Sequence, residues 1–163
     1  MIHSAIHTAR HEVACIIHTH SLAGCAVSTL PDGVVLHDQQ SMMLHNRMAY
    51  HDLEGIATDL SEQERLVSDL GDAVVLVLRH HGLLTVGRSI GEAFRRMYYL
   101  ERACRLQLQV MHTGTTPLAA PQSVAEHTAR QWEEGLAGQG TIAPIEWPAL
   151  MRQMQRKDPS YLS

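Results

Sequence analysis

Cysteine is scarce in this chain of 163 residues. The sequence holds three, Cys15, Cys25 and Cys104, an odd number with no CxxC pair among them. This pattern is typical of reduced, buried thiols and not of a disulfide framework. It therefore predicts a protein of the cytoplasm.

An excess of basic charge is also missing. Thirteen Lys and Arg stand against seventeen Asp and Glu, a net charge of -4, so no basic field is available to hold the phosphates of a nucleic acid. We expect no nucleic-acid partner. The remaining composition is that of an ordinary globular protein, and the length suits a single domain over residues 1–163 with one core.

Long apolar runs are absent as well. No stretch reaches the roughly 18 apolar residues that a membrane span needs. The start, MIHSAIHTARHE, has neither the charged beginning nor the continuous apolar core of a signal peptide. We expect a soluble, cytoplasmic protein without a membrane partner.

The patterns that are present predict helices around a small sheet. Apolar spacing and capping residues predict helices at 2–10, 21–30, 64–72, 89–112 and 123–136. Apolar and β-branched runs predict strands at 13–20, 47–52 and 73–79 and within 80–87, with a short extended run after the Pro-Asp-Gly turn at 31–33. Residues 73–79 form an unbroken apolar run, which is typical of a strand buried on both faces. Residues 147–157 are expected in a polar tail.

Histidine is abundant, with twelve residues, and an HTH motif ends the first predicted strand. Side chains alternate along a strand, so His18 and His20 point the same way about 7 Å apart, while Thr19 points to the opposite face. Two neutral imidazoles at one edge leave a divalent metal open on its other side. A third ligand must then come from elsewhere in the fold.

The third ligand is expected in the stretch LRHHGLL, at the end of the strand predicted at 73–79. His80 and His81 are both candidates, and a glycine follows that permits a sharp turn. Neighbouring residues point oppositely on an extended strand, so the two do not easily ligate together. An HxH motif taken alone is more often a surface or hydrogen-bonded pair, but a second histidine cluster at another strand end favours a three-histidine metal site.

The runs IHSAIHTARHEVACIIHTHS and LRHHGLLTVGRSIGEAFRRMYYLERA resemble the class II aldolase/adducin family, whose signature is an HxH at the end of one strand and a later HG after another. The match covers residues 2–112, with 63 residues from His18 to His81, and leaves 113–163 as C-terminal helices and tail. The resemblance implies an α/β fold, a three-layer α/β/α sandwich around a mostly antiparallel sheet.

By the same resemblance, the metal ligands are His18, His20 and His81, with zinc the usual ion and manganese or another divalent metal the alternative. His80 stands where many relatives have Asn, which implies an outer or structural role. The implied activity belongs to carbohydrate metabolism: cleavage of a small hydroxy-carbonyl, sugar-derived substrate through a metal-stabilised enediolate, or the related epimerisation, dehydration or decarboxylation. The family also implies a homo-oligomer, specifically a tetramer.

The aldolases carry a catalytic glutamate and phosphate-holding loops before the helix that here begins at Ile2. By resemblance, both would precede Met1, so an N-terminally truncated chain is expected and no catalytic residue is assigned. The chain is then a metal-dependent lyase, an inactive truncated relative, or a non-catalytic, adducin-like binding and assembly module.

Other acidic and imidazole side chains could replace the missing base on chemistry alone, although solvated or capping roles are the default for exposed carboxylates. They are Glu12, Asp38, His51, Asp52, Glu54 and Glu101. His3 and His7 are spaced four apart on a predicted helix, as metal pairs can be, but that face suits solvent equally well.

Overall fold

The structure is a computed structural model that describes residues 2–55, 60–137 and 143–162. Within these residues, one mixed sheet contains the strands β1 (Cys15–Thr19), β2 (Met48–His51), β3 (Val75–Leu78) and β4 (Gly82–Gly87) in the order β1-β4-β3-β2. β4 pairs antiparallel with both β1 and β3, whereas β2 runs parallel to β3. The prediction of a mostly antiparallel sheet is confirmed.

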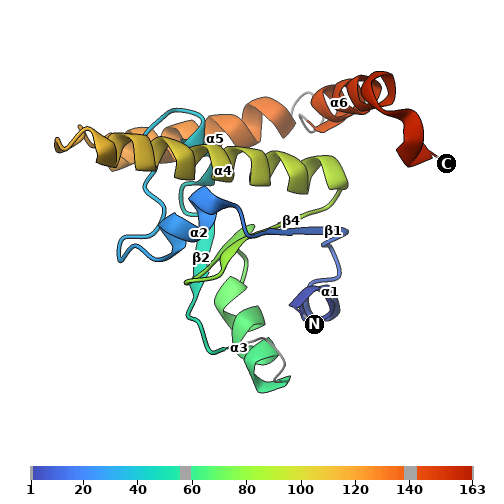
Figure 1. The fold of residues 1–163 in the computed structure, drawn as a ribbon, viewed down its shortest axis with the longest axis horizontal. Coiled ribbons are helices and arrows are strands. Elements are labelled where there is room, and N and C mark those ends of the chain that lie inside the picture. The colour runs from blue at the N-terminus through green and yellow to red at the C-terminus, as the bar shows by residue number, and fades with distance from the viewer. Residues whose placement is uncertain (1, 56–59, 138–142, 163) are drawn as a thin grey trace.

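Helices cover both faces of the sheet (Figure 1). They are α1 (Ile2–Ala9), α2 (Leu22–Ser28), α3 (Leu60–Leu70), α4 (Ile90–His112), α5 (Gln122–Ala137) and α6 (Ala143–Lys157), with the 3-10 turns η1 (Ser41–Leu44) and η2 (Pro159–Leu162). α2 and α4 lie on one face, with α5 and α6 on the same side, and α1 and α3 lie on the other. The predicted three-layer α/β/α sandwich is therefore confirmed.

The strand β3 is buried along its whole length, as its unbroken apolar sequence predicts. Side chains alternate along it, so Val75 and Val77 enter a core with Val27 of α2 and Leu100 of α4. Leu76 and Leu78 enter a second core on the opposite face, which includes Ile6, Leu66, Leu70 and Leu84. A strand with a core on each side needs apolar residues at every position.

The C-terminal region differs from the sequence-based expectation. Residues 147–157, expected in a polar tail, belong to helix α6. Contacts with α4 hold this helix: the rings of Trp147 and Phe94 are 5.5 Å apart at their centroids, and Glu146 pairs with Arg95 at 3.1 Å. The expected short run after the Pro-Asp-Gly turn forms no strand.

All three cysteines are free thiols. Cys104 is fully buried, and burial raises the pKa of its thiol to about 12. Cys15 and Cys25 are only half-buried, so the expectation of three buried thiols is correct for Cys104 alone. None of the helices in the described ranges is long and apolar enough to cross a bilayer.

Candidate metal centre

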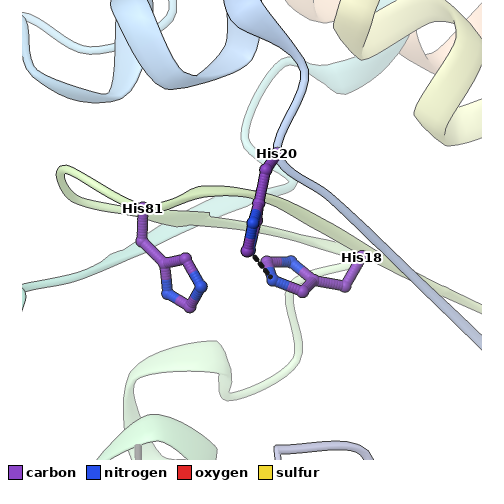
Figure 2. Close-up of side chains that lie close together, drawn as sticks. All are labelled: His18, His20 and His81. Atoms are coloured by element: carbon purple, nitrogen blue, oxygen red, sulfur yellow. Dashed lines mark hydrogen bonds between the residues drawn. The ribbon is translucent and has the colours of Figure 1, made fainter. Parts of the chain in front are cut away.

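Sheet pairing brings the three predicted histidine ligands to one place (Figure 2). His18 lies on β1 and His20 directly follows that strand, while His81 lies in the turn that joins β3 to β4. β1 pairs with β4 so that His18 stands opposite Leu84, only three residues after His81. The β1–β4 register therefore places the HTH motif beside the turn.

The three imidazoles form a compact group. Their ring centroids are 4.6 Å apart for His18 and His20, 4.9 Å for His18 and His81, and 4.6 Å for His20 and His81. The candidate ligand atoms all lie within 4.8 Å of one another. Over residues 2–55, 60–137 and 143–162, this is the one such group of three or more His, Cys, Asp or Glu side chains.

Hydrogen bonding prepares His18 for coordination. Its Nδ1 lies 2.9 Å from the carbonyl oxygen of Leu83, so an Nδ1–H donates there and the Nε2 lone pair faces the group. The Nε2 atoms of His18 and His20 are 2.8 Å apart. A tetrahedral zinc with Zn–N distances of about 2.0–2.1 Å holds two ligand nitrogens roughly 3.3 Å apart. A side-chain shift of about half an ångström thus fits the pair to an ion.

Electrostatics favours the coordinating form of His18 and of His81. Burial lowers the pKa of His18, and the nearby His81 and His20 lower it further, against the hydrogen bond to Leu83. Burial also lowers the pKa of His81, helped by His20 and opposed by the charge of Glu62. Both rings therefore remain neutral to lower pH than an exposed histidine, and a metal binds the neutral ring.

The turn before β4 depends on glycine. Gly82 has φ +156°, and a Cβ there would lie 2.3 Å from the carbonyl oxygen of Thr19 and 3.2 Å from Cδ2 of His20. His80 has φ +56° and an exposed side chain outside the three-histidine group. Asn is among the residues that tolerate this left-handed conformation best. The geometry therefore places His80 in the turn and does not support it as a metal ligand.

Most of the other candidates have local roles. Three carboxylates form ion pairs: Glu12 with Arg10 at 2.7 Å, Glu54 with Arg65, and Glu101 with Arg105 at 2.8 Å, and Glu101 also accepts a hydrogen bond from Ser21. Asp38 accepts a hydrogen bond from Ser41 N at 2.8 Å, and the His7 ring bonds through Nδ1 to the carbonyl oxygen of Val13 at 3.0 Å. Asp52 lines an open polar cavity of about 370 Å³. His3 is exposed. None of these belongs to the three-histidine group.

His51, the remaining candidate, is buried beside Glu62. His51 is 4% exposed, with Nδ1 at 2.7 Å from Asp69 Oδ2 and Nε2 at 3.8 Å from Glu62 Oε1. Glu62 is 7% exposed and was not singled out in the sequence, where the helix was expected to begin at residue 64. The burial of Glu62 could have been recognised from its spacing. Glu62 precedes the buried Leu66 and Leu70 by four and eight residues and so shares their helix face.

Comparisons with known proteins agree on one family. The model of the class II aldolase and adducin N-terminal domain matches residues 1–108. A Caulobacter vibrioides protein named for the class 2 aldolases is 39% identical over 161 residues, covering 98% of this chain and 62% of the relative. Rat alpha-adducin is 35% identical over 166 residues, covering 94% of this chain and 22% of the adducin.

Solved structures show the same fold. An aldolase II superfamily protein from Pseudomonas syringae aligns with a TM-score of 0.85 at 43% identity, covering 96% of this chain and 61% of that one. L-fuculose 1-phosphate aldolase from Glaciozyma antarctica aligns with a TM-score of 0.79 at 28% identity, covering 97% and 59%. The chain thus spans about 62% of the length of its bacterial relatives. With the family model matching well over half of its residues, this chain belongs to the class II aldolase and adducin family.

Proposed function

We propose that this chain is a divalent-metal-dependent protein of the aldolase/lyase type, acting on a small hydroxy-carbonyl substrate derived from a sugar. One observation carries the proposal: three histidine side chains from two distant segments place their ligand atoms within 4.8 Å at one edge of the sheet. Three nitrogen ligands with an open side are typical of catalytic zinc, and manganese is the alternative.

The chain's own residues would supply binding and orientation. His18, His20 and His81 would hold the ion, and the Leu83 carbonyl fixes the ring of His18. A bound divalent ion acts as a Lewis acid that polarises a substrate carbonyl. The three ligands are neutral, so the ion's double charge is not reduced by its protein ligands.

A general acid/base is not assigned. No carboxylate among the described residues joins the three imidazoles in the group. Proton transfer to or from carbon needs a group within hydrogen-bond reach of the substrate. We therefore propose metal and substrate binding for this chain and assign no proton-transferring group.

We also propose that the protein acts in the cytoplasm and assembles as a homo-oligomer. By family resemblance, this homo-oligomer is a tetramer.

A second candidate function is a non-catalytic binding and assembly module. The observation that favours it is the similarity to alpha-adducin across 94% of this chain. A module of this kind needs no open metal site. Metal and ligand binding therefore separate the two candidates.

The metal content of protein purified without an affinity tag tests the proposal. We expect about one divalent ion per chain by plasma mass spectrometry, as a single three-histidine site requires. Calorimetry should then detect binding of dihydroxyacetone or its phosphate, and this binding should disappear after treatment with EDTA and return with zinc.

Two results would contradict the proposal in different ways. Protein that holds no ion, even after incubation with zinc or manganese, would remove the metal site and favour the assembly module. Protein that holds the ion but binds neither probe would leave a structural metal.

A further inference from the structure

A second layer of polar groups lies behind His81, between the sheet and α3. A cavity of about 10 Å³ there is lined by the buried or half-buried polar side chains of His51, Glu62 and His81, by Asp52 and Arg79, and by apolar side chains that include Leu66 and Leu78. This volume is close to the smallest that holds one water molecule. The polar side chains around it, His51, Glu62 and His81 among them, supply the partners that a water there needs.

Glu62 is unusual among the carboxylates whose burial the structure describes, because it is only 7% exposed. A buried carboxylate is costly unless other groups compensate its charge. Its contact with His51 Nε2 is 3.8 Å long, beyond hydrogen-bond distance, and that nitrogen has no hydrogen-bond partner among the described residues. His51 itself is held in place by Asp69 at 2.7 Å.

The carboxylate of Glu62 lines the same small cavity as His81 without joining the ligand group. Glu62 is absent from the set of side chains whose ligand atoms lie within 4.8 Å of one another. Glu62 is therefore a neighbour of the candidate ligand His81 and not one of the ligands.

We propose that Glu62 is a positioning residue for the metal centre: through one water in this cavity it accepts a hydrogen bond from the ring N–H of His81 and so orients that ring. His51, fixed by Asp69, shares the same water and holds the Glu62 carboxylate in place. The inference rests on the proposed metal site. Carboxylates that receive the second ring N–H of a ligating histidine fix its tautomer and strengthen it as a ligand.

A Glu62→Gln variant tests this role, with Glu64→Gln as its matched control. Both substitutions remove one negative charge from α3, but Glu64 is exposed. Zinc affinity is measured by competition with a chelator. We expect E62Q to bind zinc about 10-fold more weakly, within the range known for such outer partners, and E64Q to bind like the unmodified protein.

A cobalt-loaded sample separates positioning from mere stability. The visible absorption bands of Co²⁺ report the ligand geometry, so E62Q should shift or weaken them and E64Q should not. An E62Q protein that melts at lower temperature, yet keeps the zinc affinity and cobalt spectrum of the unmodified chain, would overturn the proposal and leave Glu62 a structural role.

The unmodified protein provides a further test if E62Q does not fold. Long-range ¹H–¹⁵N NMR of the zinc-loaded chain should show one ring nitrogen of His81 bound to metal and the other carrying a slowly exchanging proton. Rapid exchange of that proton with solvent would overturn the proposal. If the unmodified chain binds no metal, the proposed function fails. If it binds metal and E62Q binds equally well, only the role of Glu62 fails.

Discussion

A His18→Ala, His20→Ala double variant is expected to lose its bound divalent ion, from about one per chain to less than about a tenth. Loss of an outer partner alone weakens a metal site roughly 10–100-fold, and removal of two direct ligands exceeds this. The remaining His81 offers a single nitrogen, which does not hold the ion through dialysis. Plasma mass spectrometry after dialysis measures the loss.

The matched control removes two imidazoles elsewhere. His11 and His127 are both exposed and lie outside the three-histidine group, so a His11→Ala, His127→Ala variant should keep its metal. Equal loss in the two double variants would mean that the ion binds nonspecifically to surface histidines. Retention of the ion by the His18, His20 variant would place the site elsewhere.

A Gly82→Ala variant is expected to lose about 3 kcal/mol or more of unfolding free energy and most of its metal affinity. The new Cβ would meet the Thr19 carbonyl oxygen at 2.3 Å, so β1 and the β3–β4 turn must move apart. This movement separates His20 from His81. Denaturant unfolding and chelator competition measure the two effects.

A Gly114→Ala variant distinguishes the steric clash of a new Cβ from the backbone strain of a positive φ. Gly114 also has a positive φ, +66°, but no atom lies within 4 Å of its added Cβ. Only backbone strain remains there, about 1–2 kcal/mol, with no effect on the metal. Similar losses in both variants, with metal binding intact, would show that close packing at Gly82 is not required.

Local sequence patterns were sufficient for much of the fold. The apolar run before His80 predicted a strand buried on both faces, and β3 is fully buried. Ser89 and Glu92 predicted the start of the long helix. The Ser89 side chain does accept a hydrogen bond from Glu92 N at 3.2 Å, and α4 begins at Ile90. These features depend on neighbours within a few residues, so they can be recognised along the chain.

Features that depend on distant partners could not be predicted in this way. The stretch 147–157 looks like a polar tail until Trp147 and Glu146 meet α4. Glu62 looks like one more surface carboxylate until α3 packs on the sheet and buries it beside His51. Both outcomes depend on tertiary packing, which overrides local polarity.

The candidate site likewise has a part that local spacing predicts and a part that depends on tertiary packing. Strand geometry was enough to predict that His18 and His20 share a side, because strand side chains alternate with a fixed period. The sequence patterns left the third ligand open between His80 and His81, and only family resemblance chose between them. The tertiary structure decided which ring joins the group, because the pairing of β1 with β4 and the turn at Gly82 bring His81 toward the HTH motif and leave His80 exposed. Register between strands 63 residues apart follows from the packing of two cores, which local spacing does not encode.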